Sequence, residues 1–161
     1  MTRVAHAGVG GWGKNVVRVA GELADLAWVC DLDAGRREAY AARYPGARVT
    51  DSFEDALADD TVDAVLIATP VPTHHALARQ ALEAGKHVFV EKPPAMRGEE
   101  MEELVGLARA RELVLMPGHL LLYHPGLRVV KELVDGGDLG DVLCVYGNRQ
   151  NLGVIRSNEN A

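Results

Sequence analysis

The chain has 161 residues, 48% of them hydrophobic and 25% charged, and its formal net charge at pH 7 is −6. These values are typical of a soluble globular domain, and a chain of this length buries roughly 70% of its unfolded surface without disulfides or metal. No run of Lys and Arg is present, which argues against a nucleic acid or an anionic membrane as partner. The first residues lack the apolar centre of a signal peptide and no apolar run reaches the length of a membrane span, so we expect a cytoplasmic protein.

Strand-like and helix-like segments alternate along most of the chain. Short apolar runs predict strands at 3–9, 26–30, 47–50, 63–69, 87–91 and 113–118. Helical periodicity predicts helices at 12–25, 35–44, 52–59, 74–85 and 97–112, with Ser52 and Asp55 as a capping pair and Thr73 as a cap. This alternation predicts an α/β fold of the Rossmann type, a doubly wound parallel sheet with helices on both faces.

The pattern changes from Tyr123 onward. Residues 124–140 predict a helix closed by glycines, 141–150 predict a strand, and the remaining tail is polar. We therefore expect a dinucleotide-binding domain over 1–120 and, over 121–161, the first elements of a second, α+β domain that this chain does not complete. We expect the chain to be a fragment of a longer protein, with a natively truncated gene product as the alternative.

The two cysteines and six histidines give no sign of a metal site. Cys30 and Cys144 lie in apolar runs, so we expect both to be buried free thiols in strands. No C-x-x-C pair occurs, and the histidines are scattered or adjacent rather than paired with carboxylates at ligand spacing.

The stretch "GVGGWGKN" holds the spacing G-x-G-x-x-G at Gly8, Gly10 and Gly13. It follows the first predicted strand and opens the first predicted helix, where the glycines permit a tight turn, close approach of a pyrophosphate and close helix packing. The helix N-terminus favours phosphate oxygens. Gly11 and Trp12 lie inside the same loop and are included among the expected cofactor contacts, although the Trp12 ring is expected to pack on the domain surface rather than stack on a base.

Asp31 stands at the end of the second predicted strand, where a carboxylate can accept hydrogen bonds from an adenosine ribose. Its charge repels a 2′-phosphate, which favours NAD over NADP. Arg36 and Arg37 lie farther along the next helix, and no arginine directly follows Asp31, so no phosphate clamp is predicted. Methyltransferases that bind an adenosyl cofactor share the glycine loop and the acidic residue, so these features alone do not name NAD.

The stretch "ATPVPTHHALARQALEAGKHVFVEKP" (68–93) resembles the glucose-fructose oxidoreductase / inositol dehydrogenase family of NAD(P)-dependent sugar oxidoreductases. The resemblance rests on Thr69-Pro70, on the G-K-H-V that begins at Gly85, and on the E-K-P of 91–93. Within the family, "GHLLLYHP" and the tail resemble the branch that oxidises the 3-hydroxyl of nucleotide-linked sugars, of the UDP-N-acetylglucosaminuronate 3-dehydrogenase type. The chain departs from the family pattern at Pro94 and Pro117, and it ends before the large sheet and catalytic histidine of the family.

The resemblance implies that Lys92 is the catalytic residue, a donor or general acid/base beside the sugar hydroxyl. Thr69, Pro70, His74, Glu91 and Lys92 are the further cofactor contacts that it implies, with a capping role for His74 and a structural role for Glu91 as alternatives. Pro93 fixes the turn that directs Lys92, and the bond between them is either cis or trans.

On the substrate side, the resemblance implies contacts from His119, Tyr123, Arg149, Asn151 and Arg156. Core packing of His119 and Tyr123 is the alternative. The substrate is expected to be a sugar or nucleotide sugar, and the full-length form is expected to be a homo-oligomer. Two other functions stay open: an inositol-type dehydrogenase of the same family, and a non-catalytic NAD-binding module.

Overall fold

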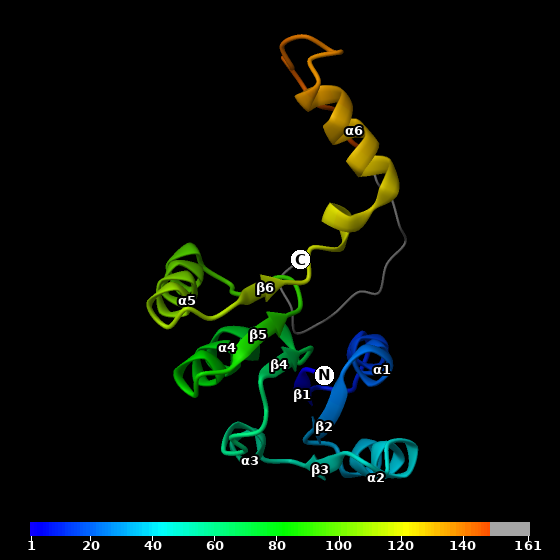
Figure 1. Ribbon diagram of the computed structural model, residues 1–161, viewed down its shortest axis with the longest axis vertical. Helices are drawn as coiled ribbons and strands as arrows, with labels where there is room; N and C mark the ends of the chain where they lie inside the picture. Colours follow the sequence, from blue (N-terminus) through cyan, green and yellow to red (C-terminus); the bar gives the residue numbers. More distant parts are fainter. Residues whose placement is uncertain (149–161) are drawn as a thin grey trace. The chain divides into compact units, whose positions relative to one another are not determined.

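The computed structural model describes residues 1–148, and these divide into two units, Met1–Gly118 and a second that begins at His119. The first unit contains a sheet of six strands, all parallel. The strands are β1 (Arg3–Ala7), β2 (Asp25–Cys30), β3 (Arg48–Thr50), β4 (Ala64–Ile67), β5 (His87–Val90) and β6 (Leu115–Pro117). Their order, β3-β2-β1-β4-β5-β6, reverses between β1 and β4, as in dinucleotide-binding folds, and the predicted Rossmann class is confirmed (Figure 1).

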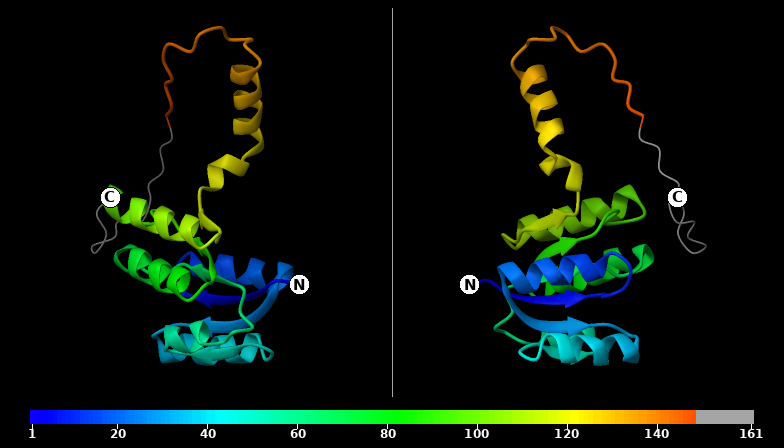
Figure 2. Two further views of the ribbon diagram at one scale, coloured as in Figure 1. Left: turned by 60° about the vertical axis from the view of Figure 1, so that its left-hand side comes forward. Right: turned by 90° about the vertical axis from the view of Figure 1, so that its right-hand side faces the viewer.

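Helices cover both faces of this sheet. They are α1 (Gly13–Leu23), α2 (Ala34–Arg43), α3 (Phe53–Leu57), α4 (His74–Glu83) and α5 (Gly98–Ala110), with a 3₁₀ turn η1 (Val71–Thr73) before α4. Helices α1 and α2 lie on one face, and α3, α4 and α5 lie on the other (Figures 1 and 2). Each predicted helix of this unit is present, with ends that differ by a few residues.

Two apolar clusters hold the layers together. Ile67, Leu82 and Leu104 are fully buried on the face covered by α4 and α5, while Val17 and Val29 are fully buried on the face covered by α1. Burying a side chain of this size stabilises a fold by about 1.5–3 kcal/mol. Residues of β1, β2 and β4 contribute to both clusters, one on each face of the sheet, and this two-sided burial specifies the register of these strands.

The helix N-termini differ in how they are capped. Asp33 Oδ1 accepts a hydrogen bond from Arg36 N at 2.8 Å at the start of α2, and Ser52 Oγ accepts one from Asp55 N at 3.2 Å at the start of α3, as predicted. The predicted cap at Thr73 is wrong, because its hydroxyl donates to Pro70 O at 2.7 Å instead of accepting from α4. No side chain caps α1, whose N-cap residue is Trp12.

The second unit begins with a 3₁₀ turn η2 (Leu120–Tyr123) and a helix α6 (Pro125–Asp135). The helix ends earlier than predicted, at a glycine pair in which Gly137 has φ of +79°. The strand predicted over 141–150 is wrong for its described part, since residues 141–148 form no strand. A strand needs a partner to satisfy its backbone groups, and no described strand pairs with this segment.

The burial of the two cysteines differs in the same way as the two segments that contain them. Cys30 is buried in β2 as expected, but Cys144 is exposed, so its predicted burial is wrong. Across residues 1–148, no helix is long and apolar enough to cross a membrane.

Candidate functional site

The carboxyl ends of four parallel strands meet at one edge of the sheet and carry residues that the sequence singles out. Gly8 follows β1, Asp31 follows β2, Thr69 lies just past β4, and Glu91 follows β5. Ligands of open parallel sheets bind beyond this edge, close to the point where the strand order reverses. The four strand ends therefore define the candidate site.

The glycine loop between β1 and α1 is packed so closely that two of its glycines leave no room for a side chain. Gly8 has φ of +88°, and a Cβ there would lie 2.7 Å from Ala68 O. A Cβ at Gly13 would lie 1.8 Å from Gly8 O. The first and third glycines thus have the predicted turn and packing roles, and together they bring the start of α1 onto the end of β1.

A histidine beneath this loop was not anticipated. His6, in β1, is 0% exposed, and its Nε2 lies 2.9 Å from Gly8 O. Burial lowers the pKa of His6 to about 4, so the ring is neutral at pH 7 and Nε2 is the donor to the Gly8 carbonyl. Its Nδ1 has no hydrogen-bond partner among the described residues. His6 therefore donates a hydrogen bond to the Gly8 carbonyl oxygen. The same oxygen occupies the space that a side chain at Gly13 would need.

Asp31 connects the end of β2 to the glycine loop. Its Oδ2 accepts a hydrogen bond from Val9 N at 2.8 Å, its Oδ1 accepts one from Asp33 N at 2.9 Å, and its side chain is only 7% exposed. A carboxylate offers about four acceptor positions, so two remain for a ligand hydroxyl. The carboxylate is thus already fixed in place beside the loop.

Arg36 lies nearer to this carboxylate than the sequence suggested. Its Nη1 is 3.6 Å from Asp31 Oδ1, and a Cβ at Gly10 would lie 3.1 Å from the same nitrogen. Because Asp33 caps α2, Arg36 lies in the first turn of this helix, and its side chain extends back toward the glycine loop. Asp33 is a sequence signal for the start of α2, but it does not by itself show that Arg36 reaches Asp31. Arg37 is occupied elsewhere, donating to Asp31 O and Leu32 O at 2.9 Å each.

The loop after β4 is fixed by side chains of the turn that follows it. Thr73 Oγ1 donates to Pro70 O and lies 2.7 Å from Thr69 Oγ1, which therefore acts as donor to it. His74 is 1% exposed, and its two ring nitrogens lie 2.7 Å from Thr69 O and 2.8 Å from Pro93 O. The ring of His74 thus contacts backbone of the loops after β4 and β5.

The loop after β5 presents an exposed lysine beside a buried acid. Glu91 is 7% exposed, its Oε2 lies 3.3 Å from Lys92 N, and its Oε1 has no partner among the described residues. The Lys92–Pro93 bond is cis. A Cβ at Gly118 would lie 3.1 Å from Glu91 Oε2, so this glycine, at the end of β6, leaves the space that the carboxylate occupies.

This edge fits a dinucleotide. The glycine loop lets a phosphate approach the backbone, since Gly11 has nothing within 4 Å of its Cβ position. No side chain caps the N-terminus of α1, whose dipole favours phosphate oxygens, and Asp31 offers acceptors to a ribose. Trp12 is the N-cap residue of α1, beside the glycine loop, and it is 49% exposed. These residues match the chemistry of a bound dinucleotide from the pyrophosphate to the adenosine ribose.

The remaining predicted contacts lie outside the first unit. His119 and Tyr123 belong to the second unit, where both are exposed and neither is core-packed. Arg149, Asn151 and Arg156 lie outside the described residues. Among residues 1–148, no group of three or more His, Cys, Asp or Glu side chains is arranged to hold a metal ion.

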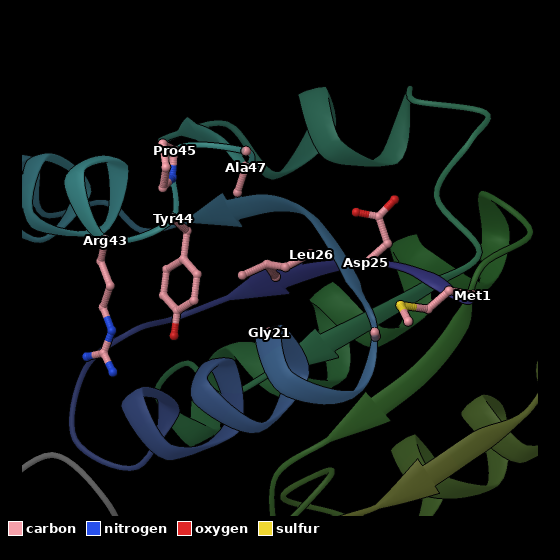
Figure 3. Close-up of a pocket in the computed structure, with 10 residues that line it drawn as sticks. Met1, Gly21, Asp25, Leu26, Arg43, Tyr44, Pro45 and Ala47 are labelled. Carbon is pink, nitrogen blue, oxygen red and sulfur yellow. The ribbon is translucent and has the colours of Figure 1, made fainter.

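A cavity of about 590 Å³ lies at the other edge of the sheet, where β1 and β2 begin. Asp25, Leu26, Tyr44 and Ala47 are among its lining residues (Figure 3). None of the residues predicted to bind cofactor lines it, and parallel sheets bind ligands at the opposite, carboxyl edge. The cavity is therefore separate from the candidate site.

Known proteins resemble the chain over this same region. The UDP-N-acetylglucosamine 3-dehydrogenase of Acidithiobacillus ferrooxidans is 37% identical over 130 residues, which are 81% of this chain and 41% of that protein. Inositol 2-dehydrogenase 3 of Saccharopolyspora erythraea is 37% identical over 153 residues, which are 91% of this chain and 45% of that protein. The chain thus spans less than half the length of these curated relatives.

A solved structure agrees with the sequence comparison. The crystal structure of GenD2 from gentamicin A biosynthesis, in complex with NAD, is 37% identical and superposes with a TM-score of 0.79, covering 85% of this chain and 40% of that chain. The sequence model described as "Oxidoreductase family, NAD-binding Rossmann fold" matches residues 2–119. The chain therefore belongs to this oxidoreductase family, the one that the E-K-P and glycine-loop motifs predict.

Proposed function

We propose that the chain binds NAD at the carboxyl edge of its sheet and serves an enzyme that oxidises a secondary hydroxyl of a sugar or nucleotide sugar. The observation that supports the proposal most strongly is that Asp31 is held beside the glycine loop. Its Oδ2 accepts a hydrogen bond from Val9 N, which lies in that loop. Gly8, Gly10, Gly11 and Gly13 would line the pyrophosphate, with Asp31 at the adenosine ribose. Thr69, Pro70 and Glu91 would lie toward the nicotinamide.

Lys92 would accept the proton of the reacting hydroxyl as a general base. Bound NAD supplies the two-electron acceptor of the reaction. The side chain of Lys92 is exposed at the end of β5, at the same edge. As a neutral amine it would accept the hydroxyl proton while the hydride leaves for NAD, and the ammonium so formed would stabilise the oxygen that has lost this proton. Glu91, buried against Gly118 and hydrogen-bonded to Lys92 N, would orient that loop.

NAD is the preferred cofactor in this proposal. The carboxylate of Asp31 would repel the 2′-phosphate of NADP, while Arg36, 3.6 Å away, would attract it. The side chain of Asp31 is only 7% exposed and accepts hydrogen bonds from two backbone amides. The side chain of Arg36 is about half exposed, so solvent screens its charge. The fixed carboxylate therefore outweighs the arginine, and the preference for NAD is expected to be moderate.

A second substrate class has support from the comparison. The relative from Saccharopolyspora erythraea is named an inositol 2-dehydrogenase and is as similar as the UDP-N-acetylglucosamine 3-dehydrogenase, at 37% identity each. A cyclitol presents the same chemistry as a sugar, a ring carbon with a secondary hydroxyl. The same Lys92 chemistry would serve it.

We further propose a cytoplasmic homo-oligomer that does not bind nucleic acid. The net charge of −6 and the absence of a cationic run support the last part. A cytoplasmic location would give the enzyme access to the NAD pool that it uses.

The reaction is tested by substituting Lys92. The substitution is made in a protein that contains this chain together with the further region present in its longer relatives. Lys92→Ala should lower oxidation of the sugar by a factor of about 10²–10⁴ while changing NADH affinity by less than about threefold. Lys131→Ala is the matched control, because Lys131 is a surface lysine of α6 that pairs with Asp135 at 2.7 Å. Turnover that is equal in the Lys92 and Lys131 variants would remove Lys92 from the reaction.

A further inference from the structure

The ring of His74 lies between two backbone carbonyl groups. His74 begins α4 and is 1% exposed. Its Nε2 is 2.7 Å from Thr69 O, and its Nδ1 is 2.8 Å from Pro93 O. Both distances are those of strong hydrogen bonds, and both partners are oxygens that can only accept.

A neutral imidazole cannot satisfy both contacts. It carries a proton on one nitrogen only, so the lone pair of its other nitrogen would face a carbonyl lone pair, in a side chain that is itself 1% exposed. An unsatisfied buried acceptor destabilises a fold, whereas a hydrogen bond from a charged donor is stronger than one from a neutral donor. The arrangement is therefore complementary to a ring that donates from both nitrogens.

We infer that His74 is held as a buried imidazolium that joins the loop after β4 to the loop after β5, and that it acts as a positioning residue for the cofactor site. This inference rests on the proposed function, because these two loops carry Thr69, Pro70, Glu91 and Lys92. His74 would hold their backbone while its ring touches neither cofactor nor substrate.

The two loops need such a link because the sheet ends before them. The last backbone hydrogen bond between them runs from Glu91 N to Ile67 O at 2.9 Å. Beyond it, within the part of the chain that the structure describes, the bonds of His74 are the hydrogen bonds that tie Thr69 to Pro93. Loss of one of them would leave the Lys92 loop free to move relative to Thr69.

The surrounding charges are compatible with a cation here. Glu91 is the one acid among the buried polar residues of the described chain, and it lies two positions before Pro93. Lys92, on the same loop, points to solvent as an exposed side chain. On the helices, Glu103 of α5 pairs with His75 and Arg79 of α4, and Glu100 pairs with Arg97. These carboxylates already have partners, and Glu91 is the buried acid on the Lys92 loop.

The neighbouring His75 provides the matched control. Its Nε2 lies 3.0 Å from Glu103 Oε2, and its side chain is 23% exposed. This contact is with one side chain on the helix surface rather than with the backbone of either loop. Replacing His75 removes a histidine from the same helix turn without touching either loop.

The experiment measures the ring protons directly in the intact chain, by ¹⁵N–¹H NMR at neutral pH, and then NADH affinity. We expect both ring nitrogens of His74 to carry protons. His74→Gln, which donates from one end only, should weaken NADH binding by about tenfold or more, while His75→Gln changes it by less than about twofold. A singly protonated His74 ring, or equal NADH affinity in the two variants, would overturn the inference.

Failure of the proposed function would look different. If the unsubstituted chain bound no NADH, the proposed function and the positioning role would both be lost, yet the NMR result would still decide whether the ring is a double donor. If the Gln variant failed to fold, the NMR of the unsubstituted chain would remain the deciding measurement.

Discussion

The carbonyl oxygen of Gly8 occupies the place where a side chain at Gly13 would begin, 1.8 Å from the ideal Cβ position. The obstacle is backbone, and it is held by His6 Nε2 at 2.9 Å, so it cannot turn aside as a side chain would. Gly13→Ala is therefore expected to force the loop and α1 apart and to cost about 3 kcal/mol or more of the free energy of unfolding. Urea denaturation measures this loss.

Gly11→Ala is the control for this substitution. A Cβ at Gly11 would have nothing within 4 Å, so its effect on the free energy of unfolding should stay within about 0.5 kcal/mol. Equal stability of the two variants would show that the loop is not packed as described.

His6 makes stability depend on pH. Burial lowers its pKa from 6.5 to about 4 in the folded chain, so the unfolded chain takes up a proton first as the pH falls. The stability present above pH 6.5 is lost progressively between about pH 6.5 and 4, by up to about 3 kcal/mol. His6→Leu should flatten the part of this slope between pH 6.5 and 5, where few carboxylates titrate. An unchanged slope in that variant would contradict the buried neutral ring.

The two cysteines should differ in reactivity. Burial raises the pKa of the Cys30 thiol to about 12, whereas Cys144 is exposed. A thiol reagent should therefore modify one cysteine in the native chain and both in denaturant. Cys144→Ser should abolish the native reaction, and rapid labelling of Cys30 in that variant would contradict its position in β2.

Asp31 and Arg36 should act in opposite directions on cofactor choice. Asp31→Asn keeps an oxygen for the Val9 amide but removes the charge, so NADH affinity should fall about tenfold while NADPH affinity holds or rises. Arg36→Ala should weaken NADPH more than NADH, because it removes the cation beside Asp31. Equal changes for both cofactors in either variant would refute the assigned role of that residue. Titrations with the two reduced cofactors measure these affinities.

The sequence predicts the Rossmann unit well because its signals are local. Each strand from β1 to β6 is a short apolar run, and the glycine spacing with Asp31 follows from the turn that joins strand to helix. The segment 141–148 has an equally strand-like pattern, but pattern alone does not supply a partner strand. Cys144 is exposed for the same reason.

The contacts that join distant loops are the part that the sequence does not reveal. The reach of Arg36 to Asp31 depends on where Asp33 starts α2, and the bond of His6 to Gly8 O depends on how tightly α1 meets β1. The placement of His74 between Thr69 and Pro93 depends on two strand ends meeting at one edge. Such relationships follow from packing in three dimensions rather than from residue spacing.

The most direct test of the central claim is a titration of the purified chain with NADH and, separately, with S-adenosylmethionine. NADH should bind the unsubstituted chain and should bind the Lys92→Ala variant with similar affinity, since Lys92 acts on the substrate hydroxyl. The chain by itself should bind this cofactor without oxidising sugars. Binding of S-adenosylmethionine in preference to NADH would contradict the account.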